Sequence, residues 1–290
     1  MGYPGANRTA QWFYRTVGGA NMGPVEKVVW HTTEGYGWPS YDGGQKAPHY
    51  TVLPDFGSER MLWRQHFPDD VNSRAMRNEP GGVQTNLDGA LQVEIVGTCD
   101  QRPEAPAWTR RENVLRSWDL LDWQVDGLAM FVAWANREHG VPLATPSLWL
   151  AYGKDPRVPG RVPASYGDSP ARMTGKAWDR FRGHCGHLHA PENVHGDAGA
   201  FQIQQVFARA HLLLEPPAPH PDTEDDDMQL TDKVTLGKAN AELLNQPDGD
   251  ATVGELLVAT AGHSAATNRL LAEQNELLGQ LVHLLTPAGP

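Results

Sequence analysis

One fourteen-residue stretch, Gly186–Gly199, limits most strongly what this chain can fold into. It reads GHLHAPENVHGDAG, and its three glycines and one proline disfavour a regular helix or strand. We therefore expect a loop that folds back on itself and brings residues that are apart in sequence to one point. The polar side chains that this loop could gather are His187, His189, Glu192, His195 and Asp197.

Imidazole and carboxylate groups are ligands of zinc, and a catalytic zinc takes three protein ligands and leaves the fourth position to water. The loop alone can supply two ligands, so a third must come from elsewhere in the chain. The alternative is a solvated polar loop with several surface histidines. Three histidines and an aspartate between proline and glycine favour the metal site over that alternative.

His31 is the best donor of the remaining ligand. It ends the apolar run Val28–Trp30 and is followed by a polar segment that leads to Gly35, which is typical of a buried strand. A histidine at the end of such a strand lies at the edge of a sheet, where sites are usually built.

A second strand is predicted over Leu91–Gly97, where apolar and polar residues alternate. The alternation puts Glu94 in the middle of the strand, on the face opposite Val93 and Ile95. A carboxylate there is costly unless it has a partner. A nearby zinc ion or its water would be such a partner.

Four motifs occur in the order found in one enzyme family: VVWHTTEG (28–35), APHYTVLPDFG (47–57), LQVEIVG (91–97) and the 186–199 loop. Together they resemble the type 2 class of zinc N-acetylmuramoyl-L-alanine amidases, which includes peptidoglycan recognition proteins and many phage endolysins. The resemblance covers roughly the first 210 residues. It is greatest to endolysins of phages that infect actinobacteria.

The resemblance implies an α/β fold with a central mixed sheet flanked by helices. It also implies a zinc ion held by His31, His187 and Asp197, with Glu94 handling the attacking water. Many members carry a lysine two residues before the last ligand, where this chain has His195. We expect His195 to stabilise the oxyanion.

The implied activity is that of a phage endolysin: hydrolysis of the amide between N-acetylmuramic acid and L-alanine in bacterial peptidoglycan. Three alternatives stay open. In the first, the chain is a peptidoglycan-binding module without catalysis. In the second, it is a zinc peptidase that cuts within the stem peptide. In the third, it is chiefly a structural oligomer.

Charge excludes one class of partner. The formal net charge is −11, whereas binding to nucleic-acid phosphates needs a basic surface. Residues 1–214 hold 21 basic and 22 acidic side chains, so almost all the excess negative charge follows Leu214. The part with the motifs is therefore not strongly repelled by an anionic cell wall.

The two cysteines, Cys99 and Cys185, cannot form a disulfide framework and are expected to be free thiols. Cys185 is a weaker candidate ligand than Asp197. We find no apolar segment typical of a signal peptide or of membrane insertion. The expectation is a protein made in the host cytoplasm that acts on the host cell wall after release.

Three regions are predicted: a catalytic domain over 1–214, a Pro-rich and acidic linker over 215–227, and a helical unit over 228–290. The last unit contains a predicted long helix over 253–285 with a seven-residue leucine repeat. Such a face needs a partner, which favours homo-oligomerisation over wall binding or folding back on the catalytic domain.

Other elements are predicted within the first region. A hairpin is expected from 49–53 and 58–66, with His49 as a packing residue, and helices are expected over 108–140 and 200–214. Residues 141–182 are expected to be irregular. Tyr36 and Trp38 are equally consistent with lining a substrate groove and with packing.

Overall fold

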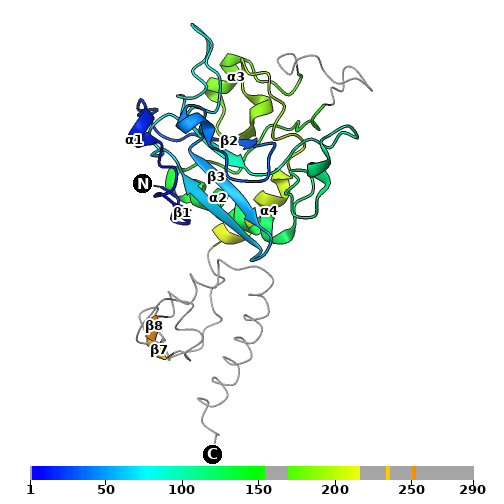
Figure 1. The fold of residues 1–290 in the computed structure, drawn as a ribbon. Helices are drawn as coiled ribbons and strands as arrows, with labels where there is room; N and C mark the ends of the chain where they lie inside the picture. Colours follow the sequence, from blue (N-terminus) through cyan, green and yellow to red (C-terminus); the bar gives the residue numbers. More distant parts are fainter. Residues whose placement is uncertain (1, 154–168, 216–232, 236–249, 253–290) are drawn as a thin grey trace, which may run out of the picture. The chain divides into compact units, whose positions relative to one another are not determined.

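A computed structural model describes most of the chain. The described residues are 2–153, 169–215, 233–235 and 250–252 (Figure 1). The chain separates into two compact units, Met1–Leu214 and Glu215–Pro290.

In the second unit, strands β7 (Lys233–Thr235) and β8 (Asp250–Thr252) form an antiparallel pair that the sequence did not suggest. The predicted linker after Glu215 and the predicted helix over 253–285 lie outside the described residues. Self-association or wall binding through residues 228–290 therefore stays a prediction.

The first unit is built on one six-stranded sheet with the spatial order β1-β4-β3-β5-β2-β6. The strands are β1 (Ala6–Asn7), β2 (Lys27–Thr32), β3 (Tyr50–Asp55), β4 (Arg60–Gln65), β5 (Ala90–Ile95) and β6 (Gly183–Gly186). Strands β3, β5, β2 and β6 run parallel to one another. Strand β4 is antiparallel to β3, and β1 is parallel to β4. The predicted mixed sheet and the predicted hairpin are thus confirmed.

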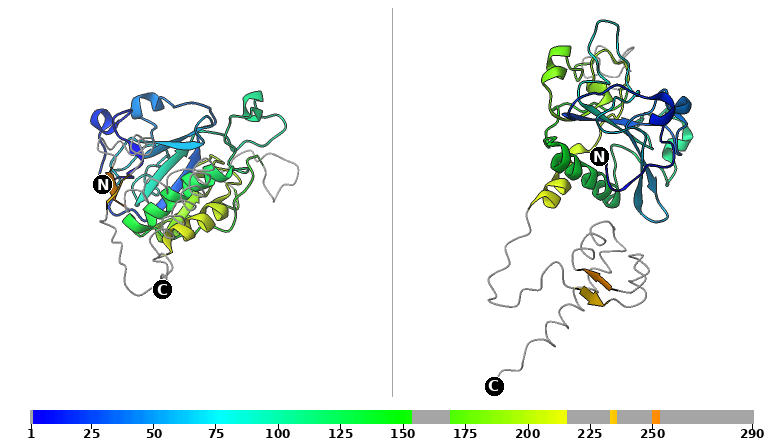
Figure 2. Two further views of the ribbon diagram at one scale, coloured as in Figure 1. Left: turned by 90° about the horizontal axis from the view of Figure 1, so that it is seen from below. Right: turned by 90° about the vertical axis from the view of Figure 1, so that its left-hand side faces the viewer.

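Two helices cover one face of this sheet. Helices α2 (Asp122–His139) and α4 (Ile203–Leu214) pack side by side there (Figures 1 and 2). The alternation in β5 is as predicted, because Leu91, Val93 and Ile95 join the core beneath these helices. Their burial provides the main driving force for the layered packing.

The opposite face of the sheet has a smaller apolar cluster and the polar residues of the candidate site. Val29, Ala90 and Cys185 pack there with Trp178 of the short helix α3 (Gly175–Arg180). Helices therefore flank the sheet on both sides, as expected, although α3 lies in a region predicted to be irregular. Within the described residues, no helix is long and apolar enough to cross a membrane.

The helix predicted over 108–140 is much shorter, because it begins only at Asp122. Before it, the chain pairs with the segment that leaves β5: Thr98 donates its N–H to Leu115, and Ser117 donates to Thr98. This pairing consumes backbone groups that a helix would need. Leu115 is buried although it is not helical. Its apolar side chain fitted the helical spacing by chance, and the helix was therefore predicted to begin too early. Gly140 ends the helix in a left-handed conformation, as predicted.

Short elements also occur among the described residues of the first unit. They are helix α1 (Tyr14–Val17) and the 3₁₀ turns η1 (Tyr41–Gly44), η2 (Ala107–Arg110) and η4 (His187–His189). In the Gly186–Gly199 stretch, Gly186 ends β6 and the rest is a loop apart from one 3₁₀ turn.

Gly183, at the start of β6, occupies a conformation that suits only glycine. Its φ is +131°, and a Cβ there would lie 2.2 Å from the carbonyl oxygen of Ala144. We expect Gly183→Ala to lower the free energy of unfolding by about 1–3 kcal/mol, because backbone strain and a clash with backbone act together. Chemical denaturation measures this loss. Gly37→Ala is the control, since a Cβ at Gly37 meets nothing within 4 Å; equal stability of the two variants would contradict the prediction.

Candidate metal centre

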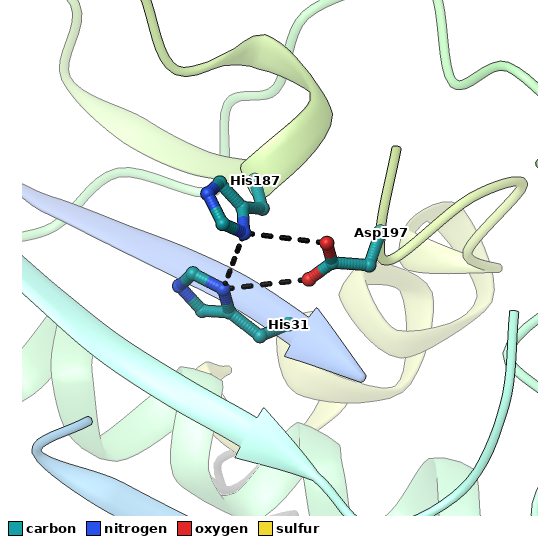
Figure 3. A group of neighbouring side chains, drawn as sticks. All are labelled: His31, His187 and Asp197. Atoms are coloured by element: carbon teal, nitrogen blue, oxygen red, sulfur yellow. Dashed lines mark hydrogen bonds and ion pairs between the residues drawn. The ribbon is translucent and has the colours of Figure 1, made fainter. Parts of the chain in front are cut away.

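Three side chains from separate parts of the chain meet at one end of the sheet. His31 is the penultimate residue of β2, and His187 follows the last residue of the adjacent strand β6. Because Trp30 and Gly186 are paired in register, the two histidines leave neighbouring strands at the same level. Asp197 reaches them from the far end of the loop (Figure 3). All three residues are buried.

The distances between the three groups fit a tetrahedral metal ion. His31 Nδ1 and His187 Nδ1 are 3.1 Å apart. Asp197 places Oδ2 at 3.4 Å from His31 Nδ1 and Oδ1 at 3.2 Å from His187 Nδ1. Ligand atoms bound tetrahedrally to zinc at about 2.0–2.1 Å lie roughly 3.3 Å from one another. The group could therefore hold a metal ion.

Asn193 fixes which nitrogen of His187 faces this group. Its side-chain Nδ2 donates to the carbonyl oxygens of Arg77 and Pro191, and its Oδ1 accepts the N–H of Arg77, so the amide has one orientation. His187 Nε2 lies 2.9 Å from that Oδ1 and must donate to it. In the ring form that binds a metal, Nδ1 of His187 carries a lone pair directed at a carboxylate oxygen of Asp197. Two acceptors facing each other fit a cation between them.

The protonation of His31 and Asp197 also suits a metal. Burial, reinforced by neighbouring His187, lowers the pKa of His31 to about 4, so its ring is neutral at pH 7. Burial opposes ionisation of Asp197, but His187 and His31 outweigh it and hold the pKa of this carboxyl well below its usual range. Neutral imidazole and ionised carboxylate are the forms that bind metals.

Glu94 lies beside the metal group on the neighbouring strand. It is the register partner of His31 on β2 and of Thr51 on β3, so it occupies the same face. Burial, together with the charges of Asp197 and Glu34, raises the pKa of Glu94 to about 8. Without metal this carboxyl therefore keeps its proton at neutral pH, and a nearby cation would favour its ionisation.

His195 lies at the rim of the group. Its side chain is 69% exposed, and its Nδ1 is 3.8 Å from Asp197 Oδ1. The ring stacks on His187 with centroids 4.9 Å apart. It is placed to meet a molecule bound at the centre.

The other polar residues of the loop have structural contacts. His189 accepts the N–H of Gly186 at Nδ1 and donates from Nε2 to the carbonyl oxygen of Leu148. Glu192 accepts the N–H of Val83 at 2.9 Å. Neither residue belongs to the metal group found among the described residues.

The remaining residues that the sequence analysis considered, Cys185, His49, Tyr36 and Trp38, also lie outside the metal group found among the described residues. Cys185 is a free thiol buried in the apolar cluster that contains Trp178, and it is not part of the ligand group found among the described residues. His49 is a packing residue as expected, because both of its ring nitrogens bond backbone groups. Tyr36 is 67% exposed and contacts Trp108, whereas Trp38 stacks on Arg64.

Two residues that shape the site were missed by the sequence analysis. Arg172 donates to the carbonyl oxygens of His187, Ala190 and His195 and so holds the loop in its curve. The second missed residue is Asn193, which orients the ring of His187. Asparagine is common in loops and Arg172 lies outside the motif, so neither position carried a signal.

Comparison with known proteins gives little further information. No family model matches the chain, and no curated protein does. Among solved structures, the chain is similar to the Staphylococcus aureus hydrolase AmiA, crystallised in complex with its ligand. The two are 13% identical over 66% of this chain and 75% of that chain, with a TM-score of 0.35. The case for a function comes from the residues of this chain.

Proposed function

We propose that this chain is a zinc-dependent N-acetylmuramoyl-L-alanine amidase of the phage endolysin type. The observation that carries the proposal is the convergence of His31, His187 and Asp197 at zinc-like spacing, with Glu94 on the adjoining strand. These are the residues to which the motif resemblance assigns catalysis. Peptidoglycan is the proposed substrate, reached after the protein leaves the host cytoplasm.

In this proposal His31, His187 and Asp197 hold the zinc. When bound, zinc lowers the pKa of a water molecule towards neutrality and polarises the scissile carbonyl. The Asp197 carboxylate offsets part of the ion's charge, so the Lewis acidity is weaker than with three neutral ligands. The buried Asn193 keeps His187 in the tautomer that presents Nδ1.

Glu94 is the proposed general base and acid. Ionised beside the cation, it accepts a proton from the attacking water at a carboxylate oxygen. It then gives that proton to the amine nitrogen of L-alanine as the amide bond breaks. Its raised pKa suits the second step, because a carboxyl that ionises near neutrality releases and regains a proton readily.

His195 is the proposed donor to the carbonyl oxygen as negative charge develops there. Removing one such donor costs about 3 kcal/mol of transition-state stabilisation in other enzymes. Stacking on His187 keeps its ring at the rim, where the carbonyl of a bound substrate would lie.

Two rivals use the same features differently. A binding module needs no carboxylate beside the metal, so Glu94 favours catalysis over binding alone. A zinc peptidase acting inside the stem peptide would use the same groups on another amide. The chemical identity of the released products distinguishes the amidase, the peptidase and the binding module.

The test combines metal removal with product analysis. Purified protein is given actinobacterial peptidoglycan before chelation, after chelation, and after zinc is restored. We expect new L-alanine amino termini with intact sugars, loss of their release after chelation, and recovery with zinc. Amino termini of other stem residues would identify the peptidase instead. Wall binding without zinc and without products would establish the binding module.

A further inference from the structure

Asn193 connects two loops through one buried amide. It lies in the loop that carries His187 and Asp197, and its side chain is buried. Its Oδ1 is 2.9 Å from His187 Nε2 and accepts the N–H of Arg77 at 3.0 Å. Its Nδ2 donates to the carbonyl oxygen of Arg77 at 3.2 Å. Both polar groups of the Arg77 backbone are thus bound by the side chain that orients a candidate ligand.

We propose that Asn193 is a positioning residue that fixes the metal-binding tautomer of His187 and couples the loop 77–83 to the metal centre. The inference rests on the proposed zinc site but not on the reaction that this site performs. It assigns the 77–83 loop as the element whose order depends on zinc.

A second set of hydrogen bonds, made by Glu192, joins the same two loops and serves as a comparison for the Asn193 bonds. The Glu192 carboxylate accepts the N–H groups of Val83 at 2.9 Å and Glu79 at 3.4 Å. This tie also packs closely, since a Cβ on Gly82 would lie 2.2 Å from a Glu192 oxygen. Within the described part of the chain, Glu192 makes no hydrogen bond or ion pair with His187 or Asp197 and lies outside the ligand group. Loss of Glu192 therefore removes the bonds to Glu79 and Val83 but leaves the Asn193 bonds to Arg77 and His187 in place.

The coupling has a physical basis in shared geometry. A hydrogen bond to the second nitrogen of a ligand histidine sets its tautomer and ring orientation, and loss of such a partner typically costs 10–100-fold in metal affinity. Without Asn193, the Nε2–H of His187 would lose its acceptor in a buried site. In return, a metal that immobilises His187 also immobilises the acceptor oxygen that Arg77 uses. Coupling of two binding equilibria is reciprocal.

The first experiment measures zinc affinity by competition with a chromogenic chelator. We expect Asn193→Ala to weaken zinc binding by about 10–100-fold, because His187 loses its orienting partner. Glu192→Ala is the matched control, and we expect its zinc affinity to stay within about twofold of the parent. Equal affinities of Asn193→Ala and the parent would overturn the proposal, as would an equal loss in both variants.

The second experiment uses the unsubstituted protein, so it tests the proposal even where Asn193→Ala fails to fold. Amide hydrogen exchange of the parent is measured with and without zinc. We expect zinc to slow exchange of the Arg77 amide at least tenfold and to slow the Val83 amide less. An Arg77 amide that exchanges equally fast in both states would overturn the coupling.

Neither experiment uses substrate, so the two proposals fail separately. A parent that binds zinc and shows the Arg77 effect but leaves peptidoglycan intact contradicts the amidase and not this inference. An active amidase whose Asn193→Ala variant keeps full zinc affinity contradicts this inference and not the amidase. A parent that binds no zinc contradicts both.

Discussion

Replacing His187 by alanine is expected to abolish both zinc binding and wall hydrolysis. The variant keeps only His31 and Asp197, whereas a catalytic zinc site needs three protein ligands. Zinc content is expected to fall from about one ion per chain to none, and release of L-alanine amino termini to fall on the order of 10³-fold or more, because unassisted water is a far weaker nucleophile. Metal analysis and product analysis on the same preparation measure both quantities.

The control for this variant is His211→Ala, which removes an exposed histidine of α4. It is expected to keep both zinc and activity. Glu94→Gln supplies a third, separable pattern: zinc retained, with hydrolysis lowered about 10²–10⁴-fold through loss of the general base. If His187→Ala kept zinc, the ligand assignment would be wrong. If Glu94→Gln kept full activity, proton transfer would have to be assigned to another group.

The central part of the fold could be predicted because its sequence pattern has one physical explanation. Apolar residues alternate along β5, and a continuous apolar run forms β2, so both strands could be located to within about two residues. The ligands could be proposed because imidazole and carboxylate groups gather in a Gly- and Pro-broken loop, and because the motif resemblance selects His31, His187 and Asp197 as the ligands. The structure brings His31, His187 and Asp197 together at metal-binding distances, and the ion itself stays a proposal.

Other features could not be predicted because they depend on contacts between distant segments. The start of α2 is set by pairing of residues 115–117 with Thr98, and no local signal distinguishes that segment from a helix. The role of Asn193 depends on the backbone of Arg77, 116 residues away. Similarly, Glu192 and His189 look like ligands in the motif and act as structural hydrogen-bond partners in the fold.

The largest expected effect on stability comes from Phe131→Ala in the middle of α2. The Phe131 ring is fully buried and contacts five other aromatic rings. These are Tyr3, Trp30, Tyr50, Trp63 and Trp134, with Trp63 stacked at a centroid distance of 4.6 Å. Truncation is expected to lower the free energy of unfolding by about 3–5 kcal/mol, because it leaves a cavity and removes favourable ring pairs.

Calorimetry of the metal-free protein measures this loss, since bound zinc would add its own contribution to stability. A loss of this size lowers the melting temperature by roughly 6–20 °C in a unit of this length. Leu212→Ala, at a side chain that is 62% exposed on α4, is the control and is expected to change stability by less than about 0.5 kcal/mol. A Phe131→Ala variant as stable as this control would contradict the packing described for the helical face.

The same variant separates fold stability from site geometry. Phe131 packs against Trp30, the residue before His31, but from the face of the sheet opposite the ligands. At temperatures where Phe131→Ala remains folded, we therefore expect its zinc affinity to stay within about tenfold of the parent, because the backbone pairing of β2 with β5 and β6 still fixes His31. Complete loss of zinc in the folded variant would show that the position of His31 depends on the helical layer as well as on the sheet.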